Sequence, residues 1–164
     1  MNLLKTIRKA RLGQLLNLFR LCMAHVDFIR PTFNATKRCM QLSTEHFGRK
    51  HYLNGQANAF RHALWNVLIG KTCWKGRKGI DRVVQWTKKI TDWHEEAFFS
   101  QELPMKMDFH NNAVGRILFE TKKEWTEDQF IQHLLHLTAA AVKIDRRTDV
   151  GMLTGQLVYI SNDD

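Results

Sequence analysis

Asparagine, arginine and histidine side chains gather in residues 56–70, on a helix face where lysine and glutamate would be usual. At about 100° per residue, one face is apolar, formed by Phe60, Ala63, Leu64, Val67 and Leu68. The opposite face carries Asn58, Arg61, His62, Trp65, Asn66 and Ile69. Such polar side chains give directed hydrogen bonds and are typical of a lined pocket. We predict a polar site here; the alternative is a polar network that only joins helices.

A second group of chemically active side chains lies in residues 91–96. His94 shares a helical stripe with Val83, Ile90 and Ala97, which predicts that it points inward with Thr91 and Glu95 at its flank. The nearby carboxylates, Asp92 among them, could orient its ring or help it to bind a divalent metal. The alternative is an ordinary core histidine.

The third group is residues 107–116, where Asp108, Asn111, Asn112 and Gly115 share one helix face. Asp108 is a good candidate for the N-cap of a helix, and paired asparagines are common near helix starts. Capping does not account for His110, Asn111 and Asn112 together. Gly115 leaves room for another group to approach this face closely.

The elements that must position these groups are predicted to be helices. Their expected ranges are 3–29 (amphipathic and closed by Pro31), 34–47, 56–70 (ended by Gly70), 80–99, 109–121 and 127–145. The last begins with a capping box of Thr126 and Gln129 and ends near the basic residues Lys143, Arg146 and Arg147. Residues 157–160 are expected to be a short strand or an extended segment. The fold class is therefore all-α, an irregular bundle of about six helices.

Composition favours one domain over residues 1–164, with an N-terminal helix in 1–30 and a motif-bearing core in 54–119. The net charge of +9 favours an anionic partner: nucleic acid, an anionic membrane surface or a phosphorylated substrate. The helix at 3–29 could contact such a membrane, or simply pack on the domain. Three scattered cysteines predict neither a disulfide framework nor a thiolate zinc site. With no evident signal peptide or membrane span, a cytoplasmic location is expected.

The segments NAFRHALWN, DWHEE and MDFHNNAVGR, in that order, resemble a functionally uncharacterised family of small bacterial helical domains. Its members occur alone and at the C-termini of secreted or toxin-like polypeptides. The resemblance covers residues 54–119 and, more weakly, 157–160. It implies that one site includes Asn58, Arg61, His62, Asp92, His94, Glu95, Asp108, His110, Asn111, Asn112 and Arg116. It supplies no reaction.

The leading hypothesis is a hydrolase acting on an anionic, phosphate-ester substrate: a small molecule, a lipid or a nucleic acid. The expected catalytic residues are His62, His94, Glu95 and Asp108, with or without a divalent metal held by His62, Asp92, His94 and Asp108. The expected substrate-binding residues are Asn58, Arg61, Asn66, His110, Asn111, Asn112 and Arg116. Two other hypotheses stay open: a non-enzymatic domain with a buried polar network, and a nucleic-acid-binding module.

Overall fold

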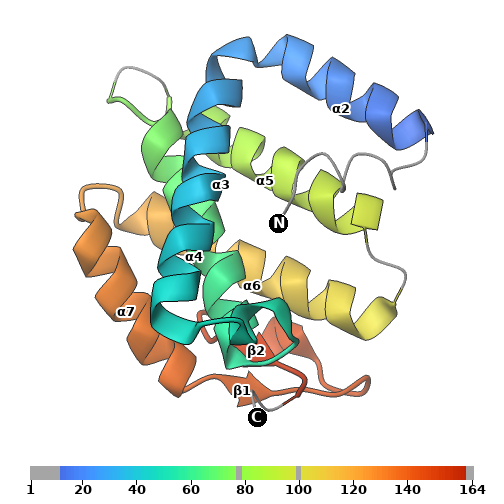
Figure 1. The fold of residues 1–164 in the computed structure, drawn as a ribbon, viewed down its shortest axis with the longest axis vertical. Coiled ribbons are helices and arrows are strands. Elements are labelled where there is room, and N and C mark those ends of the chain that lie inside the picture. Colours follow the sequence, from blue (N-terminus) through green and yellow to red (C-terminus); the bar gives the residue numbers. More distant parts are fainter. Residues whose placement is uncertain (1–11, 77–78, 99–100, 162–164) are drawn as a thin grey trace.

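Helix α4 (Gln56–Cys73) lies at the centre of the molecule and the other helices pack around it (Figure 1). The computed structural model describes residues 12–76, 79–98 and 101–161. Within these ranges the remaining helices are α2 (Leu12–Ala24), α3 (Val26–Phe47), α5 (Ile80–Phe98), α6 (Glu102–Thr121), α7 (Glu127–Ala139) and the short 3-10 helices η1 (Lys50–Tyr52) and η2 (Val150–Met152). The prediction of an all-α domain is confirmed. No helix in these ranges is both long and apolar enough to cross a bilayer.

The central position of α4 explains why its polar face lacks lysine and glutamate. It packs against α3, α5, α6 and α7, and 14 of its 18 residues are buried. The predicted end at Gly70 is wrong, because the helix continues to Cys73. Gly70 is instead a point of close packing: a Cβ there would overlap the ring of Phe119 on α6. The polar face of α4 is therefore an interior face that needs polar partners.

The predicted single helix at 3–29 is also wrong, although residues 3–11 lie outside the part that the structure describes. The helix is interrupted at His25, which separates α2 from α3. Pro31 lies inside α3 instead of closing a helix. Packing holds this stretch helical: Phe28 is fully buried against Trp86, whose Nε1 donates to Thr32 Oγ1 at 2.8 Å. These contacts offset the roughly 3 kcal/mol that an internal proline costs a helix.

Helix α6 begins seven residues before its predicted start at 109. Pro104 lies in its first turn, where the backbone N–H that proline lacks has no partner within the helix. As a consequence Asp108 is not an N-cap but a buried residue of the helix interior. Any partner of its carboxylate must therefore come from another helix.

The C-terminal third of the chain confirms two predictions and corrects one. Thr126 and Gln129 form the predicted capping box at the start of α7, and residues 158–159 are a strand. Helix α7, however, ends at Ala139 instead of 145, so Lys143, Arg146 and Arg147 follow it. The chain forms β1 (Val142–Lys143), which pairs in parallel with β2 (Val158–Tyr159). This small sheet closes one end of the bundle (Figure 1).

His51 in η1 is fully buried beside the polar face of α4. Its Nε2 lies 3.1 Å from Thr44 Oγ1, and its carbonyl accepts a hydrogen bond from Arg61 Nε. Burial, helped by the positive charge of Arg61, lowers the pKa of His51 to about 4. The folded protein therefore holds a neutral imidazole that the unfolded chain would protonate at about pH 6.5.

This lowered pKa predicts a loss of stability in mild acid. Stability from neutral His51 is fully present above about pH 6.5 and falls as pH drops towards 4, by up to about 3 kcal/mol. Urea unfolding of the wild type and of His51→Gln between pH 7 and 4 measures it. The difference between the two proteins should shrink as the pH falls; a constant difference would contradict the buried neutral state.

Candidate functional site

Three helices bring their polar faces together at one interior cluster. Side chains four residues apart lie on one helix face, and each of the three helices contributes residues at this spacing. The contributors are His62 and Asn66 from α4, Thr91 and Glu95 from α5, and Asp108, Asn112 and Arg116 from α6. The three segments that the sequence singled out thus converge, as the hypothesis of a shared site required.

His62 is the centre of this cluster. Its Nε2 lies 3.3 Å from Asp108 Oδ1, and its Nδ1 lies 3.4 Å from Glu95 Oε1. None of the three side chains is more than 1% exposed. One ligand atom from each lies within 4.8 Å of the other two. One histidine and two carboxylates in such a group match the ligand chemistry of a divalent metal ion.

Two asparagines hold the ring and the carboxylate in place. Asn112 Oδ1 accepts a hydrogen bond of 2.7 Å from Asn66 Nδ2 and lies 3.3 Å from His62 Nδ1. Asn112 Nδ2 donates to Glu95 Oε1 at 2.9 Å. Asn66 Nδ2 also donates to the carbonyl of His62. Asn112 therefore connects all three helices and fixes how far His62 lies from Glu95.

Arg116 extends the cluster along α6. Its Nη1 donates to Asn66 Oδ1 at 3.2 Å and to Thr91 Oγ1 at 3.3 Å. Burial lowers its pKa, and the carboxylate of Asp92, 3.9 Å away, opposes this effect. Asp92 itself is only partly buried and pairs with Lys88 at the surface. Arg116 therefore joins α6 to Asn66 on α4 and to Thr91 on α5, next to the cluster around His62.

The hydrogen bond between Arg61 and His62 assigns the proton on the ring. Arg61 Nη2 lies 2.8 Å from His62 Nε2, and a guanidinium can only donate, so Nε2 is the acceptor. The ring proton is then on Nδ1, directed at Asn112 Oδ1 and Glu95 Oε1. Asp108 Oδ1 faces Nε2 and accepts no hydrogen bond from any residue that the structure describes. Two acceptors this close need a proton or a cation between them.

The two carboxylates of the cluster have opposite shifts in pKa. Burial raises the pKa of Asp108 to about 6, an effect that His62 opposes and Glu95 reinforces. Burial also disfavours ionised Glu95, but its interactions with His62 and His94 outweigh that effect and lower its pKa. Near neutral pH, Glu95 is the ionised partner of His62, and Asp108 is the group that exchanges a proton or a cation.

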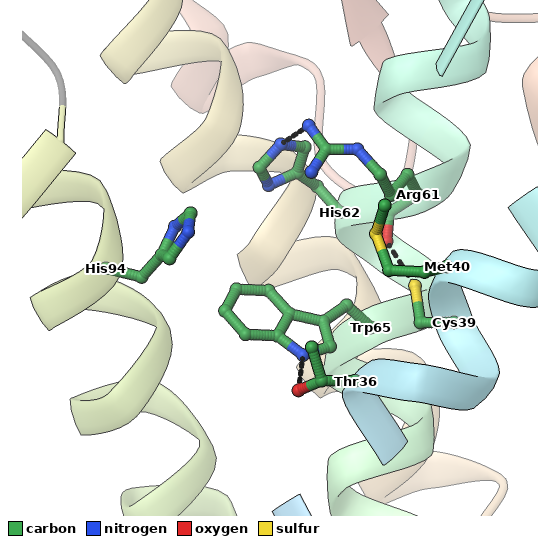
Figure 2. Close-up of a pocket in the computed structure, with 7 residues that line it drawn as sticks. All are labelled: Thr36, Cys39, Met40, Arg61, His62, Trp65 and His94. Carbon is green, nitrogen blue, oxygen red and sulfur yellow. Dashed lines mark hydrogen bonds between the residues drawn. The ribbon is translucent and has the colours of Figure 1, made fainter. Parts of the chain in front are cut away.

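A small cavity lies between α3, α4 and α5, and His62 is part of its lining (Figure 2). Its lining residues are Thr36, Cys39, Met40, Arg61, His62, Trp65 and His94. His94 projects from α5 on one side, and Arg61 and His62 project from α4 on the other. The cavity measures about 10 Å³, which is room for one water molecule. Of the polar residues in its lining, His62 is buried, whereas Arg61 and His94 are partly exposed.

Family comparison agrees with the extent of this site. The model of the family described as Domain of unknown function (DUF6973) matches residues 19–142, which include every residue of the cluster. The chain belongs to this family. No curated protein and no solved structure matches it.

The match begins within α2 and ends at the first residue of β1, so this DUF6973 domain includes more than the 54–119 core. In particular it includes α3, whose residues Thr36, Cys39 and Met40 form one wall of the cavity. The motifs in the sequence gave no indication of that wall. Its residues are neither charged nor histidines, and nothing in their types marks them for chemistry.

Three predicted site residues lie away from the cluster of this DUF6973 protein. Asn58 Nδ2 donates to the carbonyl of Leu53, in the turn before α4. His110 Nε2 lies 2.9 Å from the carbonyl of Gln156. Asn111 bonds both the backbone N–H and the carbonyl of Val158, each at 2.9 Å. These residues fix the turn before α4 and strand β2, so their contacts are structural.

The group of side chains that could hold a metal ion lacks two members of the predicted ligand set, Asp92 and His94. Asp92 points to Lys88 and Arg116, and His94 Nδ1 lies 3.5 Å from Glu95 Oε2 at the edge of the cluster. The prediction placed His94 inward with Glu95 at its flank. In the structure Glu95 is fully buried, whereas the side chain of His94 is 12% exposed. Glu95 therefore takes the place of both Asp92 and His94 beside His62 and Asp108.

Proposed function

We propose that this protein is a hydrolase acting on an anionic, phosphate-ester substrate, with a divalent metal held by His62, Glu95 and Asp108. The observation that carries the proposal is the convergence of these three buried side chains, one of which, His62, also lines the cavity. Asp108 Oδ1 and Glu95 Oε2 are buried and have no hydrogen-bond partner among the residues described. Such oxygens are costly to bury unless a proton or a cation satisfies them.

The chemistry follows from what surrounds the three ligands. A bound divalent ion would lower the pKa of a water molecule and supply a nucleophile at neutral pH. The cavity that His62 lines has the volume for that water. Arg61, partly exposed at the same cavity, would bind the phosphate and its developing negative charge. His94, on the opposite wall, would protonate the leaving group.

The surrounding polar residues act as positioning groups in this proposal. Asn112 holds Glu95 and the His62 ring, and Asn66 holds Asn112 in turn. Such outer contacts fix the orientation of ligands and the basicity of the ring. Arg116 donates to Asn66 and so helps to hold the asparagine that positions Asn112.

A second candidate is a non-enzymatic domain in which the same residues form only a structural network. The tightness of the cluster favours it, because His62, Glu95 and Asp108 are shielded from solvent and the cavity is small. In that case no metal binds, and a proton on Asp108 joins it to His62. The two candidates differ in what metal ions do to the protein.

Metal binding is the direct test. Purified protein stripped with chelator should bind one Zn²⁺ or Mn²⁺ ion per chain. At a free metal concentration of about a hundred times Kd, unfolding should cost about 2.7 kcal/mol more. Elemental analysis and denaturant unfolding with and without chelator measure both quantities. Glu95→Gln should remove the effect.

Asp92→Asn is the matched control for that test, because Asp92 is a neighbouring carboxylate outside the three-residue group. It should keep metal binding and the stabilisation that metal provides. If the wild type binds no ion and chelator leaves its unfolding unchanged, the metal-dependent mechanism is rejected and the structural network is the better account.

A further inference from the structure

An apolar stripe runs along the outer side of α2 and continues onto the start of α3. Its members recur every three or four residues, as one helix face requires, and are 41–74% exposed. They are Leu12, Leu16, Phe19, Met23, Val26, Ile29 and Phe33, named below the α2–α3 apolar face. A contiguous exposed surface of this kind marks an interaction site in a protein that is otherwise well packed.

The helix that carries this face is fixed to the domain. Gln14 Nε2 donates to the carbonyl of Glu96, and Trp93 Nε1 donates to the carbonyl of Gln14, at 3.0 and 2.9 Å. Leu21 and Cys22 pack against the main core from the inner side of α2. The helix lies along the rim of the molecule (Figure 1). Its outer side is therefore presented to the surroundings in a defined orientation.

The charge of the chain is concentrated at the same end. Residues 1–38 contain eight of the 25 lysines and arginines and one of the 16 acidic residues, so they carry +7 of the net +9. The one acidic residue, Asp27, forms an ion pair with Arg82. Arg20, Arg30 and Lys37 are exposed on α2 and α3, beside the apolar stripe. Apolar and basic side chains together are typical of helices that lie on anionic bilayers.

We propose that the α2–α3 apolar face binds an anionic membrane surface. Its apolar side chains would enter the boundary between headgroups and acyl chains, and the basic residues would contact lipid phosphates. The same charge argues against a second copy of the chain as the occupant. Pairing two such faces would bring the exposed Arg20, Arg30 and Lys37 of both copies together, and like charges facing each other oppose association.

The α2–α3 apolar face adjoins the cavity along α3. Phe33, Thr36 and Met40 lie on one side of α3, and the last two line the cavity together with His62. A protein lying on this face would therefore hold the cavity near the lipid headgroups. If the proposed hydrolase activity is correct, its phosphate-ester substrate would then be a phospholipid. Membrane binding itself does not depend on that activity.

Vesicle co-sedimentation of the full chain tests the membrane proposal. The wild type should bind vesicles of equimolar phosphatidylcholine and phosphatidylserine, and bind pure phosphatidylcholine vesicles much less. Leu16→Gln combined with Phe19→Gln should weaken binding by about tenfold or more, because both side chains lie within the face. Met152→Gln, at an exposed apolar side chain elsewhere, should bind as the wild type does.

Circular dichroism and thermal unfolding should show that all three proteins are folded. Equal binding by the double variant and the wild type would overturn the proposal. Failure of the wild type to bind anionic vesicles would overturn it as well. A dimer in sedimentation equilibrium that the double variant loses would assign the face to a second copy instead. Metal binding at His62 is measured separately, so a negative result for membrane binding would not contradict the proposed hydrolase, and the reverse is also true.

Discussion

Replacing Asp108 with asparagine is expected to stabilise the metal-free protein at pH 8. Burial, with a contribution from Glu95 and against the effect of His62, raises the pKa of Asp108 to about 6. A raised carboxyl pKa means that stability is fully present below the unfolded pKa of about 3.8 and is lost as pH rises through 6. The ionised side chain therefore costs up to about 3 kcal/mol at pH 8. Asparagine has nearly the same shape and no charge.

The same substitution is expected to abolish the proposed activity. It removes one of three metal ligands, and phosphate-ester hydrolysis should fall by about a hundredfold or more. Urea unfolding with chelator present at pH 5 and 8, and hydrolysis of a chromogenic phosphate ester with added Mn²⁺, give the two readouts. The stability gain should be smaller at pH 5, where Asp108 is already largely protonated.

The structural-network candidate predicts a different outcome for Asp108→Asn. There, the amide of asparagine takes over the bond from Asp108 to His62, and the wild type has neither a response to metal nor hydrolysis for the substitution to remove. Asp92→Asn serves as the control, since Asp92 lies nearby but outside the group around His62. If the variant is more stable but inactive, the result supports a functional site at His62 in which ionised Asp108 lowers the stability of the fold. A destabilised variant would rule that interpretation out.

The polar faces of α4 and α6 could be predicted from the sequence because their composition departs from a solvated helix. His62 and Asn66 recur at four residues, as do Asp108, Asn112 and Arg116, and neither face carries lysine or glutamate. Those faces are buried in the structure. Their mutual contacts follow from the packing of α4 against α6, which periodicity alone does not specify.

The face of α5 could not be predicted in the same way. Apolar spacing places His94 inward, with Val83, Ile90 and Ala97, and a glutamate is normally expected at the surface. The buried face instead includes Thr91 and Glu95. Glu95 is tolerated inside because Asn112 and His62, on two other helices, contact its Oε1. Such compensation is a tertiary property, and no local pattern on α5 reveals it.

The predicted helix boundaries near the two prolines were wrong for a related reason. Pro31 was expected to close a helix, and Pro104 falls between the helices expected at 80–99 and 109–121, yet Pro31 lies inside α3 and Pro104 inside α6. Pro104 is in the first turn, where a missing N–H costs little. Pro31 is tolerated because buried Phe28 and the bond from Trp86 to Thr32 hold the helix around it. Packing therefore outweighs the helix-breaking tendency of Pro31, and the position of Pro104 in the first turn makes it compatible with α6.

Replacing Gly115 with alanine is expected to separate the two helices that carry the site. A Cβ at Gly115 would overlap the carbonyl oxygen of Ala63 and lie 2.8 Å from its Cα. The obstruction is backbone, so a side-chain rotation cannot relieve it, and α4 and α6 must move apart. Overpacking of this kind costs about 3 kcal/mol or more, so the unfolding free energy should fall by that amount.

The same movement would lengthen the contacts of His62 with Asp108 and Asn112, since Ala63 adjoins His62 on α4. Metal affinity should therefore fall in Gly115→Ala protein that remains folded at low temperature. Gly13→Ala is the matched control, because nothing lies within 4 Å of its added Cβ on the surface of α2. It should leave metal affinity unchanged and stabilise the protein by up to about 1 kcal/mol. If Gly115→Ala proved as stable as Gly13→Ala, the close approach of α4 and α6 would not be what positions the site.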